Sequence, residues 1–450
     1  MAPRWAFAVA ALVICTGAHA QSTPQELKAA LDQAMRTIQD LQARVKALED
    51  QQPKTAAAPV APAASAAVAG APAVAPGSVA DEGAKEPGQA RVEIYGQAMV
   101  DAIYDFKKVN PEWAATLRPS QIPIVCPGSP GCGKNESFTF SIRQSSLGVR
   151  AFIPTSMGVI KTDLAFDLFG SDGGTNVHWL RAWAELGRFG VGQTDSNFMD
   201  SSVFPNTTDY WGPPGMVFVR NPQLRVTPVN GDGIAVAISL EAPNSAIDTG
   251  KLTQFDPVLG AGIASRNRLP DLIASFTYER DWGHVRAAGI LRQVGVHNTA
   301  SADGEPSSQK PGYGLNVSGT WKVFSKEQVN WQVVGGKAIA SYMNDGGVDL
   351  APNASLRAET VSTVGWLAYY NHAWSDKWTS AIGYSEHKQS NTDGQLATAF
   401  RRGTYASVNA LYALTKNVTS GVEYIWGKNE SKDGQSATDY RLQWSTRVSF

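Results

Sequence analysis

The sequence ends with the stretch Tyr440-Arg-Leu-Gln-Trp-Ser-Thr-Arg-Val-Ser-Phe450, which decides the fold. Its even positions carry mostly large apolar side chains, and its odd positions carry arginine, glutamine and serine. A period of two indicates a β-strand with one apolar and one polar face. Such a strand, finishing on an aromatic residue, is typical of barrels in the bacterial outer membrane, where one face meets lipid and the other a wet lumen.

The same alternation recurs from Arg91 onward and predicts an all-β transmembrane barrel of about 16 antiparallel strands. Besides the terminal strand, we expect strands near 91–101, 137–153, 158–169, 176–187, 188–194, 215–227, 232–242, 270–280, 283–294, 312–321, 328–337, 361–373, 377–388, 402–413 and 417–427. The apolar parity flips within the second of these stretches, which indicates a β-bulge near Ser145-Ser146.

The connections between these strands alternate in length. Short ones are Pro154 to Met157, Gly187, Asp281-Trp282, Trp374 to Lys377 and Thr415-Lys416. Long ones lie near 106–136, 195–214, 243–269, 295–311, 338–360, 388–401 and 428–437. Short periplasmic turns that alternate with long outer loops are typical of an outer-membrane barrel.

Three segments precede the barrel, which we place at 91–450. Residues 1–20 have the basic start, apolar run and small-residue cleavage site of a secretory signal peptide. Residues 21–50 are expected to form a short periplasmic α-helical coiled coil, and 51–90 an Ala/Pro-rich linker. The coiled-coil seam consists of Leu27, Leu31, Ala34, Ile38, Leu41, Val45 and Leu48. An ordinary amphipathic surface helix is the alternative for 21–50.

Charge and cysteine content indicate which kinds of binding partner and cofactor the chain is expected to have. The formal net charge is −1, from 39 basic and 40 acidic residues, and nothing indicates a nucleic-acid partner. Cys126 and Cys132 are expected to form a disulfide in an oxidising compartment, with a metal pair as the weaker alternative. The six histidines are scattered, so we predict no metal site, no cofactor and no catalytic constellation.

The segment 195–214 is a candidate constriction loop. A barrel of about 16 strands has a lumen wide enough to hold water and needs a narrowing to be selective. The residues that we assign to this constriction are Asp195, Asp200, Asp209, Tyr210 and Trp211. An ordinary outer loop is the alternative.

Strand parity predicts which arginines face the lumen. Arginine on a lipid-facing position costs about 2–4 kcal/mol at mid-membrane. The arginines that parity places inside are Arg143, Arg150, Arg181, Arg225, Arg286 and Arg292. Lumenal arginines favour anions over cations, although they can instead serve only to pair with acids on the wall.

The order of segments resembles that of the DcaP-like trimeric porins of Gram-negative bacteria. The stretches that carry the resemblance are Val92-Glu-Ile-Tyr-Gly96, Ser141-Ile-Arg-Gln-Ser-Ser-Leu147, Gly192-Gln-Thr-Asp195, Phe198-Met-Asp200, Trp211 to Pro222 and Ile238-Ser-Leu-Glu-Ala-Pro243. The resemblance implies a homotrimer in the outer membrane, with N-terminal helices that associate in the periplasm. It also implies passive uptake of small hydrophilic solutes, biased to organic anions such as dicarboxylates, with no reaction catalysed.

Two other functions are compatible with the sequence. An outer-membrane barrel enzyme that hydrolyses lipid or peptide requires a nucleophile and a base within hydrogen-bond reach. An adhesin or cell-wall tether predicts a plugged barrel whose loops or helix carry the binding.

Overall fold

Antiparallel strands make up most of the protein that the structure describes. This computed structural model describes residues 89–125, 132–324 and 326–450, which all belong to one structural unit. The predicted signal peptide, the coiled-coil seam and nearly all of the linker lie outside the described residues, and so does Cys126.

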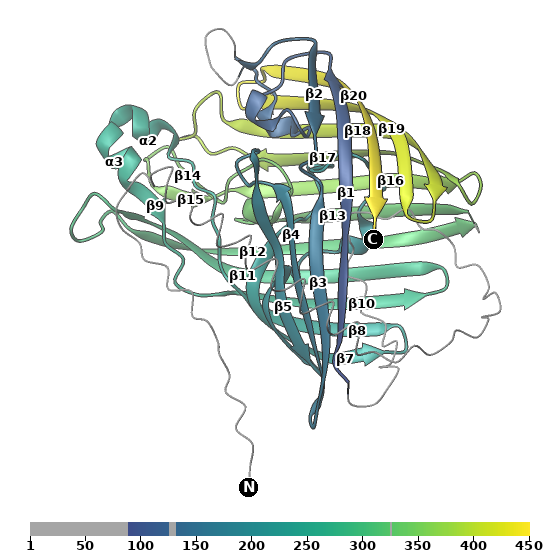
Figure 1. Cartoon of the computed structure of the whole chain (residues 1–450). Helices are drawn as coiled ribbons and strands as arrows, with labels where there is room; N and C mark the ends of the chain where they lie inside the picture. The colour runs from purple at the N-terminus through teal and green to yellow at the C-terminus, as the bar shows by residue number, and fades with distance from the viewer. Residues whose placement is uncertain (1–88, 126–131, 325) are drawn as a thin grey trace, which may run out of the picture. The chain divides into compact units, whose positions relative to one another are not determined.

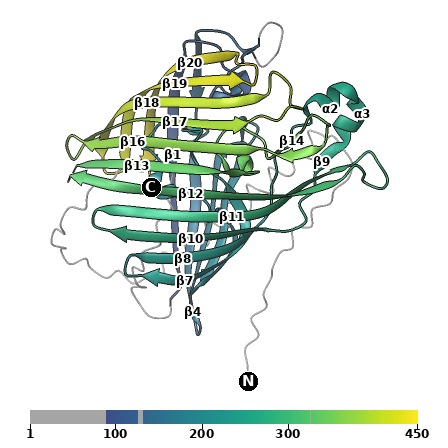
Figure 2. The same ribbon diagram turned by 180° about the vertical axis from the view of Figure 1, so that it is seen from behind.

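The strands close into a barrel (Figures 1 and 2). The closure is made by β20, which pairs with β1 and places Trp444 opposite Ala102. Two short strands, β2 and β9, continue β3 and β10 in the sheet, so each of these pairs counts as one barrel strand. The barrel of the described residues therefore has 16 strands. The prediction of about 16 antiparallel strands is confirmed.

Most bounds agree with the sequence pattern to within a few residues, but the strand predicted at 215–227 begins later, at Arg220, and continues to Gly231. The strands are β1 (Arg91–Asp105), β2 (Ser137–Ser141), β3 (Ser146–Thr155), β4 (Gly158–Phe169), β5 (Thr175–Leu186), β6 (Phe189–Asp195), β7 (Arg220–Gly231), β8 (Ile234–Glu241), β9 (Ile263–Ser265), β10 (Asp271–Arg280), β11 (Gly283–Asn298), β12 (Ser308–Phe324), β13 (Glu327–Lys337), β16 (Ser362–Ala373), β17 (Trp378–Ser390), β18 (Phe400–Thr415), β19 (Val418–Ser431) and β20 (Ser436–Ser449). The break between β2 and β3 lies where the parity flip predicted a bulge.

Other elements lie in the longer connections. They are η1 (Pro111–Trp113), η2 (Pro119–Gln121), η4 (Ser201–Val203), α2 (Gly250–Phe255), α3 (Pro257–Gly262), η5 (Ala340–Tyr342), β14 (Leu350–Pro352) and β15 (Ala358–Thr360). None of the helices in the described residues is both long and apolar enough to cross a membrane.

The terminal strand shows the two faces that its sequence predicts. Outward-facing Leu442 and Trp444 are each 45% exposed, whereas inward-facing Arg441 and Gln443 have no exposed surface. Because the apolar face is exposed and the polar face is covered, the barrel has the polarity of a protein that sits in lipid rather than in water.

The rhythm of short and long connections also holds, with two exceptions on the side of the long loops. The connection predicted at 428–437 is short, because β19 continues to Ser431 and β20 begins at Ser436. The strands extend here because their inward side chains stay covered at the loop end: Asn429 donates to the backbone of Ser120 and Ile122. The connection between β4 and β5 is likewise only a short turn, which runs from 170 to 174.

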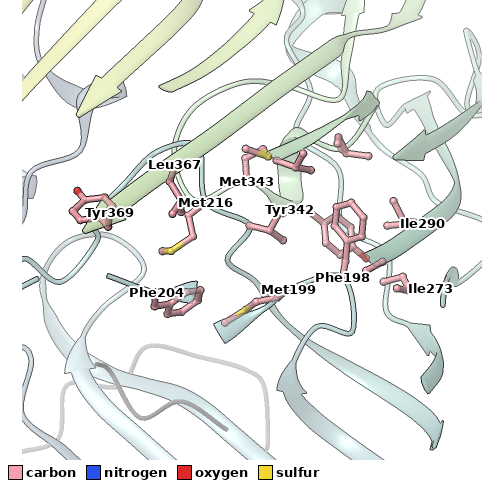
Figure 3. Close-up of a cluster of buried hydrophobic side chains, with 14 residues drawn as sticks. Phe198, Met199, Phe204, Met216, Ile273, Ile290, Tyr342, Met343, Leu367 and Tyr369 are labelled. Carbon is pink, nitrogen blue, oxygen red and sulfur yellow. The ribbon is translucent and has the colours of Figure 1, made fainter. Parts of the chain in front are cut away.

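The lumen contains a hydrophobic core of its own (Figure 3). Apolar side chains on the inner wall of the barrel pack against two segments that fold inward, the inserted loop (residues 196–219) and the second loop (residues 338–361). The wall contributes Ile273, Ala288, Ile290, Val334, Leu367 and Tyr369, and the two loops contribute Phe198, Met199, Phe204, Met216, Val217, Ile339, Tyr342 and Met343. Each fully buried aliphatic side chain in such a core stabilises the fold by about 1.5–3 kcal/mol.

Candidate pore and constriction

The inserted loop is fixed to the inside of the barrel by amide side chains of the wall. These amides donate to backbone carbonyls of the loop, so that the loop's unpaired peptide groups are satisfied away from bulk water. The bonds are Asn316 to Phe198 (2.8 Å), Asn330 to Phe204 (3.1 Å), Asn409 to Asn206 (2.6 Å), Gln443 to Thr208 (2.8 Å) and Gln332 to Gly215 (3.2 Å). Their donors come from strands between β12 and β20, so the loop crosses the lumen rather than hanging outside.

The three predicted aspartates of this region anchor the loop. Asp195, at the end of β6, accepts from Arg220 Nε at 2.8 Å. Asp200 accepts from the Ser318 hydroxyl at 2.7 Å and lies 2.8 Å from His284 Nε2. Burial alone would raise the pKa of Asp200, but the hydrogen bond and charge of His284 lower it, with help from other groups on the wall.

Asp209 is the most enclosed of the three. It accepts from the Thr116 hydroxyl at 2.8 Å and the Leu117 backbone N–H at 3.1 Å, and lies 3.8 Å from Arg441 Nη1. Burial raises the pKa of Asp209 in spite of these partners. A carboxylate so occupied has little capacity left to repel a passing anion.

Tyr210 and Trp211 lie where the inserted loop meets residues 106–125, the segment after β1. The Tyr210 ring stacks on Phe169, with ring centroids 4.1 Å apart. Trp211 Nε1 donates to the Asn344 carbonyl at 2.6 Å. The Arg118 guanidinium contacts two indoles, 4.1 Å from the Trp113 ring and 4.2 Å from the Trp211 ring. Each such cation–π contact stabilises this junction by about 0.5–2 kcal/mol.

The sequence pattern did not indicate that two further segments of the described residues, 106–125 and the second loop, also enter the barrel. Arg118 Nε and the Ser120 N–H and hydroxyl all bind the Asp345 carboxylate, which joins the two segments. Composition could have indicated that these segments are buried, because large apolar residues are uncommon in loops that face water. Trp113, Ile339 and Tyr342 are such residues, and all three are buried.

Two cavities beside the inserted loop are lined by several arginines each. The first, the constriction cavity, lies between this loop and the wall strands β1, β3, β4, β5 and β20, and includes Arg181, Arg220, Arg447, Tyr210 and Trp211 in its lining. The second, the arginine cavity, has a volume of about 270 Å³, and its lining includes Arg150, Lys161, Arg181, Arg225 and Arg286. Arg181 lines both cavities and so connects them.

Four of the six predicted arginines therefore come together in one cavity. Arg150 and Arg181 share the carboxylate of Asp163, at 3.5 and 3.0 Å, and the same carboxylate accepts from the Tyr95 hydroxyl. One acid thus neutralises only part of the charge of two arginines.

Arg225 and Arg286 have no carboxylate in ion-pair contact among the described residues. Arg225 donates to Gln223 Oε1 at 3.0 Å and to the Asp195 carbonyl at 2.5 Å. Arg286 donates to Thr277 and to both oxygens of Asn197, at 2.9–3.0 Å. Within the described part of the chain, Arg286 Nε and Arg181 Nη1 are buried donors without a hydrogen-bond partner, so these two guanidinium groups are not fully satisfied by the protein.

The other two predicted pore arginines lie outside the arginine cavity, and for Arg292 the structure corrects the expected role. Arg292 faces inward, as parity requires, but its side chain has no exposed surface, and it lies 3.2 Å from Asp271 and 3.6 Å from Asp349. The second loop covers it: Arg292 donates to the Ala338 carbonyl and the Ser341 hydroxyl. Arg143 lies in the break between β2 and β3 and donates to the Gly173 carbonyl and the Thr175 hydroxyl, so it holds the β4–β5 turn.

The remaining site predictions concern cysteine and metal. Cys132 is buried and disulfide-bonded; Cys126 lies outside the described residues, so their pairing stays a prediction. In the ranges that the structure covers, no group of His, Cys, Asp and Glu side chains could hold a metal ion.

Comparison with known proteins shows which families and solved structures this barrel resembles. Residues 77–450 match the family described as DcaP outer membrane protein. The crystal structure of the outer membrane channel DcaP of Acinetobacter baumannii is 20% identical, with a TM-score of 0.69, over 82% of this chain and 99% of that one. An anion-selective porin from Comamonas acidovorans is 10% identical, with a TM-score of 0.52, over 80% of this chain and 100% of that one. At these identities the likeness shows the fold. No curated protein matches the chain.

Proposed function

Because this chain belongs to the DcaP outer membrane protein family, a family of outer-membrane barrels, we propose that it is a passive diffusion channel whose lumen favours small organic anions. The observation that carries the anion preference is that Arg225 and Arg286 line one cavity without a carboxylate partner. Rings of lumenal arginine or lysine select anions, because they replace part of the hydration of a carboxylate and repel cations.

The acids that line the same cavity support this proposal, because most of them are already engaged. Asp163 is shared by two arginines, Asp195 pairs with Arg220, and Asp200 is held by His284 and Ser318. An engaged carboxylate contributes less field to the lumen than a free one. The local field therefore favours anions even though the formal charge of the chain is −1.

A dicarboxylate suits this arrangement better than a monocarboxylate. The cationic groups lie in two neighbouring sets, Arg225 with Arg286 and Arg150 with Arg181, and all four line the arginine cavity. A solute with a carboxylate at each end can exchange one contact while it keeps the other. Each contact then stays weak enough for release, which conduction requires.

Single-channel recording in planar bilayers tests the proposal. We expect an anion-selective reversal potential in a salt gradient, with conductance in steps of three if the protein is a trimer. The double variant Arg225→Glu/Arg286→Glu should move the reversal potential toward cation selectivity. Arg188→Glu/Lys416→Glu makes the same change of charge at exposed positions in two short turns and serves as the matched control.

The outcomes separate the proposed channel from the two other functions. If the double variant keeps the wild-type reversal potential, those arginines do not set selectivity. If the wild-type protein does not conduct at all, the lumen is closed, and a plugged adhesin or a barrel enzyme becomes the better explanation.

A further inference from the structure

The outward face of β17, β18 and β19 carries charges in a place where a barrel wall is normally apolar. These strands lie side by side at one edge of the view in Figure 2. Lys388 on β17 lies opposite Arg402 on β18, and Arg402 lies opposite Glu430 on β19. Two residues nearer the middle of each strand, on the same face, Glu386 lies opposite Thr404, and Thr404 lies opposite Lys428. We call this set, with Arg401 added, the basic rim.

The paired residues of the basic rim face outward, and Arg401, at the register shift beside Arg402, contacts the outward-facing Glu430. Along β17 the inward positions Ala381, Ser385 and His387 are buried, whereas Ile382 and Tyr384, of the same parity as Lys388, are exposed. On β18 and β19 the outward positions Val408 and Tyr424 are likewise exposed. The rim therefore shares its face with the apolar rows that contact lipid and does not belong to the lumen.

Its height on the barrel corresponds to lipid headgroups. At the other end of β17, Trp378 and Tyr412 form a cross-strand aromatic pair 4.8 Å apart. Trp378 and Lys388 are ten residue steps apart, which at roughly 3.3 Å per residue and a tilt of about 40° spans about 25 Å. That is the height of the apolar band of an outer-membrane barrel, so the rim lies at its boundary on the side of the long loops.

The charges of the rim do not cancel. Its four cations face two carboxylates. Glu430 is contacted by three of them: Arg402 at 2.5 Å, Lys428 at 3.7 Å and Arg401 at 3.9 Å. Glu386 lies 3.9 Å from Arg402. Lys388 is exposed and pairs with none of the described acids. A net positive patch remains, directly above apolar and aromatic side chains.

We propose that the basic rim binds the phosphorylated glycolipid of the outer leaflet. Its phosphates contact Lys388, Lys428 and the adjoining arginines, and its acyl chains lie against the outward apolar residues nearer the middle of the strands. Charge complementarity supports a phosphate, because basic side chains at this height attract anionic headgroups. The apolar continuation supports a lipid rather than a free anion: Ile382, Val408 and Tyr424 lie on the same outward rows, and Tyr384 and Trp426 lie between them and the rim. The bound lipid would stay outside the pore, so this inference is independent of the channel's selectivity.

Native mass spectrometry of the detergent-solubilised full chain tests the proposal, with diphosphorylated lipid A and its fully dephosphorylated form as probes. We expect the wild-type protein to bind the diphosphorylated probe more tightly. Lys388→Gln/Lys428→Gln should weaken that binding about 30-fold, the effect of two basic contacts at a membrane surface. Lys322→Gln/Lys337→Gln removes two lysines from other parts of the barrel and should leave the affinity unchanged.

Three results would overturn the proposal. Equal binding of the two probes by the wild-type protein would mean that acyl chains alone drive binding, and this comparison does not depend on any variant folding. Unchanged affinity in the rim variant would remove the rim from the site. A change in oligomeric state without loss of lipid affinity would identify the rim as a contact between copies of the chain.

Discussion

The Arg441 guanidinium and the Asp105 carboxylate form a two-point ion pair inside the barrel, with Nε–Oδ1 at 2.6 Å and Nη2–Oδ2 at 3.1 Å, and neither side chain has any exposed surface. The pair links the first and last strands of the closed sheet. Arg441 also donates to the Ala114 carbonyl at 3.1 Å and lies near Asp209 of the inserted loop. One side chain thus joins barrel closure to the inserted loop and to residues 106–125.

Replacement of Arg441 by methionine should therefore destabilise the barrel strongly. The change leaves Asp105 and Asp209 buried without their cation, and loss of one partner of a buried ion pair costs about 3–5 kcal/mol. The midpoint of unfolding in urea, followed by tryptophan fluorescence in detergent, measures the effect. Lys416→Met, at an exposed turn, is the control. If the charge is the cause, Arg441→Met/Asp105→Asn recovers part of the loss; no recovery would show that Arg441 acts through packing.

The contact of Asp200 with His284 should make the inserted loop sensitive to acid. Because the pKa of Asp200 is lowered in the folded protein, its ionised form stabilises the fold above the unfolded pKa of about 3.9. This contribution is lost as the pH falls through the lower folded value. Asp200→Asn should cost about 2 kcal/mol at neutral pH, the worth of a hydrogen bond to a charged group.

Unfolding curves of the wild type and Asp200→Asn between pH 7 and pH 2.5 measure this dependence. The two proteins should differ most at neutral pH and converge at the acid end. Asp376→Asn, an exposed carboxylate at a short turn, should track the wild type throughout. A gap between the wild type and Asp200→Asn that stays constant with pH would contradict a role for the Asp200 charge.

Gly192, three residues before the end of β6, should not tolerate a side chain. Its φ of +116° is a conformation that L-residues rarely adopt, and an added Cβ would lie 2.0 Å from the Ala182 carbonyl oxygen. Gly192→Ala should therefore cost at least about 1–3 kcal/mol in backbone strain alone. Gly289→Ala, where an added Cβ has no heavy atom within 4 Å, is the matched control. Equal unfolding midpoints for the two variants would contradict this reading of the β5–β6 contact.

The barrel could be predicted from the sequence because its rule is local. Alternation needs only neighbouring residues, so Leu442 and Trp444 were placed outside and Arg441 inside without knowledge of their partners. The partner of Arg441 could not be predicted in this way, because Asp105 is 336 residues away in the chain and the contact forms only when the barrel closes.

The surroundings of inward-facing side chains were harder to predict, because the inserted segments bury some of these side chains and leave others beside a cavity. Parity placed Arg292 and Arg286 on the same inner face of β11, yet Arg286 lines a cavity and Arg292 is covered by the second loop. Inward-facing Ile290 and Leu367 likewise contradict the simple expectation of a polar lumen, because they pack against the loops. Which loop covers which stretch of wall depends on contacts distant in sequence, and alternation carries no information about them.

The N-terminal heptads should matter for assembly rather than for the barrel. Three heptads are marginal as an isolated helix and gain stability when they associate, so deletion of 24–50 should lower the yield of trimer while each barrel still folds. Analytical ultracentrifugation in detergent measures the trimer fraction, and heat-modifiable gel mobility reports the barrel. Deletion of 51–77, of equal length but within the linker, is the control and should leave the trimer intact. A full yield of trimer without 24–50 would mean that the barrel walls alone hold the copies together and that the helix serves another purpose, such as spacing or contact with the cell wall.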